Sequence, residues 1–175
     1  MALAHGILAC LVDTPLSGYD LAQQFDGSVG YFWAASHQQI YRELSKLEQQ
    51  GWIAAEIVPQ IGKPDKKLYH VTEIGKQQLK AWMSDPAAPS PIKDDLLVKI
   101  FAGYVAPPAI LEELKRHQKA HQEKLAAYKA LEQKYFSNPR SLPETEKFKY
   151  LTLLNGISYE THWLAWIDRA MELLK

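Results

Sequence analysis

The sequence has little of three features that narrow function quickly: cysteine, excess charge and long apolar runs. The single cysteine, Cys10, lies in the apolar run ILACLV, where a buried and reduced thiol is expected. One cysteine cannot form an internal disulfide, which fits a reducing compartment. The opening MALAHGILACLVD has no basic segment and only a short apolar run. We therefore expect no signal peptide, no membrane span and a cytoplasmic location.

The charge balance excludes a global electrostatic argument for any partner. Twenty Lys and Arg residues offset twenty Asp and Glu residues, so the formal net charge is +0. A chain that binds nucleic acid or another charged partner would have to do so through local charge.

Motifs for catalysis are also missing. The sequence has no Gly-rich phosphate loop, no G-x-S-x-G segment and no cysteine beside an obvious base, and GSVG at 27–30 is too short to hold phosphates. His117 and His121 are four residues apart and could share a metal ion. Gln118 stands where the zinc protease motif has Glu, and no third ligand is evident. We expect no enzyme activity, no cofactor and no metal site.

A proline-containing segment, DPAAPSPIKDD, divides the chain. Pro86, Pro89 and Pro91 interrupt the helical pattern on either side. We predict one domain over residues 1–86 and a second over residues 92–175. The 47% apolar content is enough for two small domains.

The first domain has the element order of a winged helix-turn-helix. Three short helical patterns come before two strand-like runs, WIAAEIV and KLYHVT, which we expect to form a small two-stranded hairpin around a turn at Pro64. Thr72 is placed to cap a fourth helix that runs to about Met83. With long helices in the second domain, the fold is expected to be mainly α.

The segment SHQQIYRELSKLEQQGW, residues 36–52, predicts a helix with two different faces. Ile40, Leu44 and Leu47 form an apolar stripe, and Ser36 and Gly51 suit the two ends. The opposite face carries polar side chains: Gln38, Arg42, Ser45 and Gln49. Gln and Arg can discriminate adenine and guanine when such a helix enters the major groove. A surface helix with solvated amides is the alternative interpretation.

The predicted hairpin turn, IGKPDKK, adds local positive charge. Lys63, Lys66 and Lys67 surround Asp65 at what we expect to be a protruding tip, where ammonium groups could contact phosphates. Residues 1–86 nevertheless contain seven Lys and Arg against nine Asp and Glu. Affinity per protomer should therefore be modest, which favours a dimer with two half-sites.

The second domain predicts protein contacts. Its last helix, from about residue 144 to residue 174, is apolar around most of its circumference, so a second protomer is the most economical cover. Tyr159, Trp163 and Trp166 are expected to lie in that dimer core, or to line a pocket for a flat aromatic effector. Both hold if the pocket lies at the dimer interface.

Four segments together resemble the PadR family of bacterial transcriptional regulators: LSGYDLAQQF, SHQQIYRELSKLEQQGWI, GKPDKKLYHVTEIGKQQLKAWM and DDLLVKIFAG. The last one, followed by two long helices, looks like the subgroup with an extended C-terminal helical domain. The resemblance implies a dimer whose C-terminal helices interlock with the partner and with its first helix. It also implies a repressor that a small molecule releases from DNA.

We therefore expect a homodimeric, sequence-specific repressor that binds a pseudo-palindromic operator. By position, the resemblance places Gln38, Gln39, Tyr41 and Arg42 on a recognition helix, three lysines at a wing tip around residue 65, and Tyr19 as a DNA-backbone contact. The expected DNA-binding residues are Tyr19, Ser36, His37, Gln38, Gln39, Tyr41, Arg42, Lys63, Lys66 and Lys67. The alternative is a protein-interaction module of the same fold, whose acidic domain docks another protein.

Overall fold

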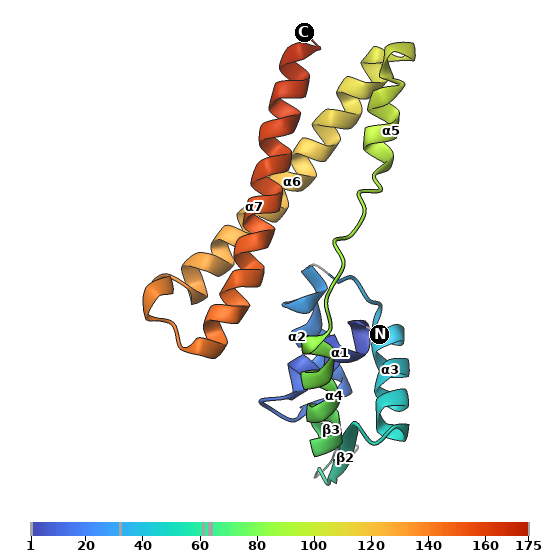
Figure 1. The fold of residues 1–175 in the computed structure, drawn as a ribbon, viewed down its shortest axis with the longest axis vertical. Coiled ribbons are helices and arrows are strands. Elements are labelled where there is room, and N and C mark those ends of the chain that lie inside the picture. Colours follow the sequence, from blue (N-terminus) through green and yellow to red (C-terminus); the bar gives the residue numbers. More distant parts are fainter. Residues whose placement is uncertain (1, 32, 61, 63–64, 175) are drawn as a thin grey trace. The chain divides into compact units, whose positions relative to one another are not determined.

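The structure is a computed structural model that describes residues 2–31, 33–60, 62 and 65–174. The chain forms two compact units, Met1–Pro89 and Ser90–Lys175. Each unit has its own helices or strands (Figure 1) and, separately, its own buried apolar cluster.

Unit 1 combines short helices with a small sheet. Its elements in chain order are α1 (Ala2–Leu11), β1 (Leu16–Ser17), α2 (Gly18–Asp26), the 3-10 turn η1 (Val29–Tyr31), α3 (His37–Gln49), β2 (Ile53–Val58), β3 (Lys66–Val71) and α4 (Glu73–Ser84). This is the order of a winged helix-turn-helix, as the sequence predicts.

The core of unit 1 joins its first three helices. The buried apolar side chains come from α1, α2, α3 and the start of β2: Ala4, Ile7, Leu8, Cys10, Leu11, Leu21, Ala22, Phe25, Ile40, Leu44, Leu47 and Ile53. Cys10 is thus buried, as expected. Burial of apolar area on this scale is what fixes the helices to one another.

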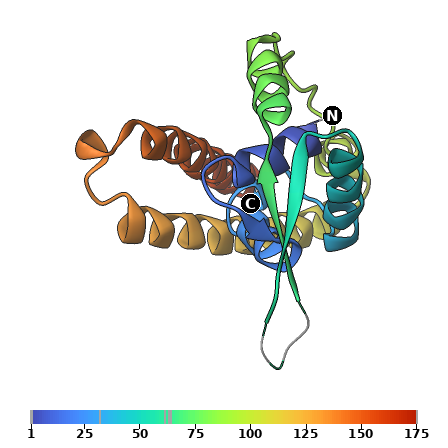
Figure 2. The same ribbon diagram turned by 90° about the horizontal axis from the view of Figure 1, so that it is seen from below.

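The sheet has three strands: β2 and β3 form the predicted hairpin, and β1 is a further strand that the sequence did not predict. β1 pairs with β3, which also pairs with β2, and both pairings are antiparallel. In the added pairing, Leu16 lies opposite Tyr69 and Ser17 opposite Leu68. A strand of two residues shows no alternating pattern, so its pairing depends on tertiary packing. The β2–β3 hairpin projects from the helices of its unit (Figure 2).

Helix α3 is closed at both ends. The Ser36 side chain accepts a hydrogen bond from the backbone N–H of Gln39, whose side chain accepts one from the Ser36 N–H. At the other end Gly51 adopts φ 70°, and the N–H groups of Gly51 and Trp52 donate to the carbonyls of Glu48 and Leu47. This is a Schellman arrangement, which favours glycine at the left-handed position. Both predicted ends of the helix are confirmed.

Unit 2 is a helical unit dominated by two long helices. Its elements are α5 (Asp95–Phe101), η2 (Gly103–Val105), α6 (Pro107–Tyr135), η3 (Pro139–Ser141) and α7 (Glu144–Leu173). α6 and α7 pair along their length and are joined through η3 (Figure 1). Its buried apolar cluster is small and comprises Ile110, Leu114 and Ile167 with partly buried neighbours. Much apolar surface on this unit therefore stays exposed.

Candidate nucleic-acid interface

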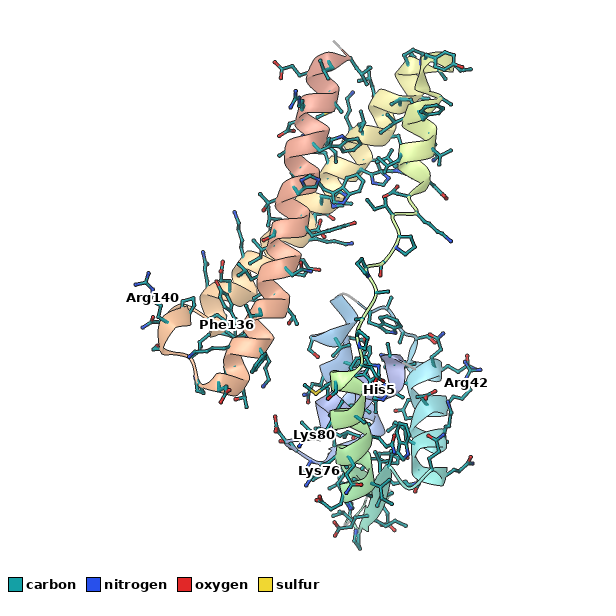
Figure 3. The ribbon with its side chains drawn as sticks, viewed as in Figure 1. His5, Arg42, Lys76, Lys80, Phe136 and Arg140 are labelled. Atoms are coloured by element: carbon teal, nitrogen blue, oxygen red, sulfur yellow. The ribbon has the colours of Figure 1, made fainter. Side chains whose placement is uncertain are left out.

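The outer face of α3 carries the strongest candidates for contact with another molecule. Ile40, Leu44 and Leu47 are each fully buried on the inner face. Gln38 and Arg42 lie on the exposed face, and Arg42 points away from the unit (Figure 3). Within the described part of the chain, neither side chain has an ion pair or a hydrogen bond. A rigidly held helix therefore presents an amide and a guanidinium whose polar groups are open to a ligand.

The side chains at the start of α3 are already engaged. Ser36 and Gln39 hold the helix cap, and His37 Nε2 lies 2.8 Å from Asp26 Oδ2, at the end of α2. Because Gln39 uses its amide oxygen in the cap, it has fewer groups left than Gln38 for reading a base. The sequence predicted Ser36, His37 and Gln39 as DNA contacts and did not predict the role of Gln39 in the cap.

Two tyrosines flank this surface. Tyr41 packs against the start of α2, where a Cβ atom built on Gly18 would lie 2.5 Å from Tyr41 Cε1. The glycine therefore permits the close approach of the ring. Tyr19 is 60% exposed, and its hydroxyl accepts a hydrogen bond of 2.8 Å from Gln23 Nε2. Tyr41 is thus half packed, whereas Tyr19 is available on the surface of α2.

The described wing lysines lie in β3 and are paired with carboxylates. Lys66 lies opposite Val58 and Lys67 opposite Ile57, so both occupy strand positions and are not part of the turn that the sequence predicted. Lys66 Nζ is 2.8 Å from Asp20 Oδ2, and Lys67 Nζ is 2.9 Å from Glu48 Oε2. The predicted contact Lys63 falls outside the described residues.

Each pair shifts the pKa of one of its members, Asp20 or Lys67. Lys66, with help from Ser17, lowers the pKa of the Asp20 carboxyl below its usual value. Glu48 raises the pKa of Lys67, whose ammonium also lies 5.1 Å from the centre of the Tyr69 ring. Both shifts favour the charged form, the carboxylate of Asp20 and the ammonium of Lys67.

A second polar group lies between α6 and α7. His121 Nδ1 hydrogen-bonds Glu160 Oε2, and the Glu160 side chain is 3% exposed. The Trp163 ring stacks on His121 with centroids 5.1 Å apart and an angle of 7° between the planes. Trp166 then meets Trp163 edge to face at 5.1 Å. The pair of polar side chains therefore sits within aromatic packing of the same protomer.

The predicted aromatic residues thus differ in their surroundings. Trp163 and Trp166 are partly buried against the core of unit 2, whereas Tyr159 is 53% exposed. Of the three, Tyr159 offers the most free surface to an effector or a second protomer.

The histidines that the sequence singled out have different partners. His117 Nε2 lies 3.9 Å from Glu113 Oε1, and its ring centroid is 6.0 Å from that of His121. Across the described ranges, no group of three His, Cys, Asp or Glu residues is arranged to hold a metal ion.

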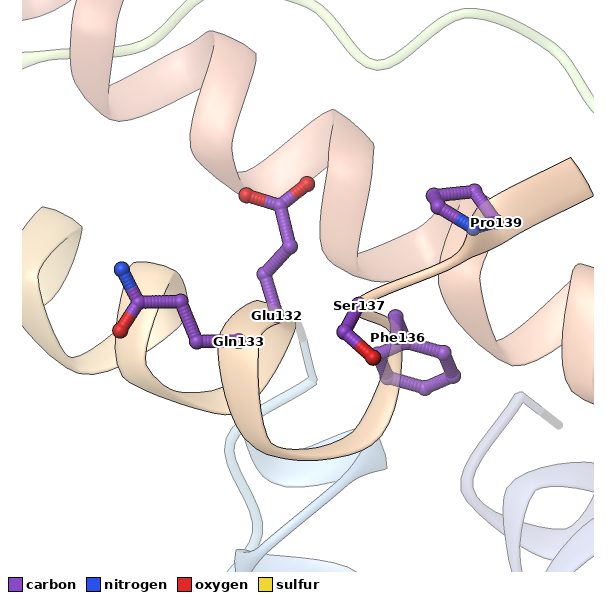
Figure 4. Close-up of a pocket in the computed structure, with 5 residues that line it drawn as sticks. All are labelled: Glu132, Gln133, Phe136, Ser137 and Pro139. Carbon is purple, nitrogen blue, oxygen red and sulfur yellow. The ribbon is translucent and has the colours of Figure 1, made fainter.

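A shallow hollow lies where α6 ends. It has a volume of about 360 Å³ and is lined by Glu132, Gln133, Phe136, Ser137 and Pro139 (Figure 4). The Glu132 carboxylate accepts a hydrogen bond of 2.8 Å from the Tyr150 hydroxyl, which raises the Tyr150 pKa. None of the aromatic residues predicted for an effector lines this hollow.

Among the described residues, no helix combines the length and the apolar character that a bilayer crossing requires.

Comparison with known proteins gives consistent matches over both units. The PadR-like family of transcriptional regulators matches residues 7–81, and a family described as virulence activator alpha C-term matches residues 92–175. A probable transcriptional regulator of Mycobacterium tuberculosis is 37% identical over 100% of this chain and 98% of its own length. The chain belongs to the PadR-like family of transcriptional regulators.

Solved structures agree with the membership in the PadR-like family. The negative transcriptional regulator PadR of Bacillus subtilis is 30% identical over 98% of this chain and 97% of its own length. Its crystal structure in complex with operator DNA has a TM-score of 0.86 at 28% identity, with 100% of both chains covered. The virulence activator AphA of Vibrio cholerae has a TM-score of 0.80 at 30% identity, over 98% of this chain and 97% of AphA.

Sequence reasoning about this PadR-like chain missed the acidic partners. Asp20, Asp26 and Glu48 each pair with a side chain that had been predicted to bind DNA. Each pair joins two elements, and Glu48 and Lys67, for example, are 19 residues apart. The only available sequence signal was the excess of acids in residues 1–86, which does not say where the acids lie.

The polar pair between α6 and α7 gives a first prediction. Glu160→Ala should lower the free energy of unfolding by about 1–3 kcal/mol, because the largely buried His121 side chain loses its hydrogen-bond partner. Urea unfolding followed by tryptophan fluorescence measures the change. Glu160→Gln is the matched control and should retain most of the stability, since the amide oxygen still accepts from Nδ1. Equal losses in the two variants would show that the hydrogen bond is not the source.

Proposed function

We propose that this protein is a homodimeric DNA-binding repressor of the PadR-like family that a small-molecule effector releases from its operator. The observation that carries the proposal is the outer face of α3, a helix capped at both ends, where Arg42 and Gln38 are exposed and have no partner among the residues that the structure describes. The operator complex of B. subtilis PadR, which shares the fold over the full chain, supports the same conclusion.

In the proposed complex, α3 enters the major groove. Arg42 supplies paired donors for guanine, and Gln38 supplies a donor and an acceptor for adenine. Two copies of α3 in a dimer would reach successive major grooves about 34 Å apart on a pseudo-palindromic operator. The remaining proposed contacts with DNA are made near the start of α3 or with the DNA backbone. They are Tyr19, Ser36, His37, Gln39, Tyr41, Lys63, Lys66 and Lys67.

Dimerisation is proposed from the exposed apolar surface of unit 2. Phe148, Leu151 and Tyr159 on α7 are all more than half exposed, and Phe101 at the end of α5 is 89% exposed. Apolar exposure on this scale is costly in water and is typical of a protein contact. A second protomer is the occupant that also gives the DNA two half-sites.

The effector is proposed to be a small aromatic molecule. A crystal structure of B. subtilis PadR in complex with p-coumaric acid, 27% identical with a TM-score of 0.80, supports this class of ligand. Tyr159, with Trp163 and Trp166 behind it, would supply an aromatic surface next to the proposed dimer contact. Release from DNA follows if the effector binds better to a dimer whose two α3 helices no longer match the operator spacing.

Repression, as opposed to activation, is proposed from the similarity to B. subtilis PadR, whose name describes a negative regulator. A reporter placed behind the promoter of the gene itself, with and without the regulator, distinguishes the two signs. Higher reporter output on deletion of the regulator is the expected result.

Side chains that read bases and those that contact phosphate should respond differently to substitution. Arg42→Ala should cost about 1–3 kcal/mol at the preferred base and relax the sequence preference, because the bidentate contact is lost. Lys66→Ala should weaken all sequences alike and lower the salt slope by about 1. Fluorescence anisotropy with a duplex selected from a random pool, and with random duplex, measures both.

Arg42→Lys is the control for that comparison, since it keeps the charge and loses the bidentate geometry. It should relax the preference as Arg42→Ala does, with a smaller loss of affinity. Preference that survives both substitutions would rule out Arg42 as a base contact. Affinity that does not change with salt would favour the protein-interaction alternative.

The proposed dimer contact is tested on α7. Leu151→Glu should shift the protein from dimer to monomer in analytical ultracentrifugation, because a carboxylate would be buried in an apolar contact. Helix content should not change, since Leu151 is already 56% exposed in the protomer. Ala120→Glu, an exposed position on α6, introduces the same charge and should leave the dimer intact. A dimer that persists in Leu151→Glu would place the contact elsewhere.

A further inference from the structure

The wing lysines are held by two carboxylates that come from different helices. Asp20 lies in the first turn of α2, and Glu48 lies in the last turn of α3. Lys66 and Lys67 are neighbours in β3, so their side chains leave opposite faces of the strand. One ammonium is paired on each face of the wing, at 2.8 Å and 2.9 Å.

The carboxylate of Asp20 is fixed in place independently of Lys66. Ser17 Oγ donates to Asp20 Oδ2 at 2.7 Å, and the Asp20 backbone N–H donates to Ser17 Oγ at 3.2 Å. Asp20 Oδ2 thus accepts from Ser17 and Lys66 together. Because Ser17 also caps α2, the carboxylate is positioned before the lysine reaches it.

We propose that Asp20 and Glu48 are intramolecular competitors of DNA phosphate, which set the affinity of the wing by occupying the ammonium groups of Lys66 and Lys67. The inference rests on the proposed DNA binding. A carboxylate and a phosphate oxygen offer an ammonium the same kind of charged acceptor. DNA must therefore displace the carboxylate before the lysine can neutralise a phosphate.

The pairs are weak enough to open. The side chains of Lys66 and Asp20 are 39% and 41% exposed, and those of Lys67 and Glu48 are 46% and 36% exposed. Ion pairs with this exposure contribute little to stability because water screens them. The competition should therefore reduce DNA affinity by a small factor. Since a lysine binds phosphate in specific and non-specific complexes alike, both affinities should fall together.

The test measures DNA affinity of the full chain after removal of each carboxylate. Asp20→Asn and Glu48→Gln should each bind both the selected duplex and random duplex about two- to fivefold more tightly at 0.15 M salt, with the ratio of the two unchanged. Glu56→Gln is the matched control. It removes the same charge from the wing hairpin, and among the described residues Glu56 has no ion pair, so its gain should be smaller.

A double substitution separates competition from direct repulsion. If Asp20 acts through Lys66, then Asp20→Asn in a Lys66→Ala background should gain no more affinity than Glu56→Gln gains in the wild-type background. A gain in the Lys66→Ala background as large as that of Asp20→Asn alone would mean that the carboxylate repels DNA directly, which contradicts the proposal. Gains of the single variants Asp20→Asn and Glu48→Gln no larger than that of Glu56→Gln would contradict it too.

The same titrations distinguish the two levels of failure. A wild-type protein that binds neither duplex at low salt would overturn the proposed DNA binding and this inference with it. A wild-type protein that binds DNA, with variants that bind no better, would overturn the inference alone. Thermal unfolding of each variant verifies that the fold is retained.

Discussion

Burial of one face of α3 is the interaction on which the proposed DNA interface depends. Ile40, Leu44 and Leu47 are fully buried in the core that α1 and α2 complete. Ser36 caps the start of the helix and Gly51 ends it, so hydrogen bonds fix both ends while burial fixes the inner face. Its outer face is therefore presented in one orientation before any ligand arrives. Preorganisation of this kind lowers the entropy lost on binding.

The positive charges around α3 differ in whether a carboxylate lies beside them, which the composition of residues 1–86 does not reveal. Arg42 is exposed without a partner in the described structure, whereas Lys66 and Lys67 each have a carboxylate beside them. Two of the acids that make residues 1–86 slightly negative, Asp20 and Glu48, thus form ion pairs with the lysines of the wing. An acidic winged helix can still bind DNA under this arrangement. Selectivity would come from α3. Asp20 and Glu48 would limit the affinity for the DNA backbone, and dimerisation would double the number of contacts with it.

The sequence predicted best what is set by neighbours in the chain. The α3 stripe, its Ser36 cap and its Gly51 end follow from helical periodicity and from residue conformations within a few positions. The third strand was missed because Leu16 and Ser17 are too few for a pattern. Pairings between elements were missed for another reason: Glu160 is 39 residues from His121, and no local signal links them. Trp163 and Trp166 likewise looked free for a partner, but they pack partly on their own protomer.

In the proposed dimer, two α3 helices read one duplex from the same side. Hydroxyl-radical footprinting on a duplex selected by the protein tests it most directly. Two protected patches on one face of the DNA, with centres about 10 base pairs or one helical turn apart, are the predicted result. A single protected patch, or uniform weak protection along the duplex, would contradict DNA reading by two α3 helices.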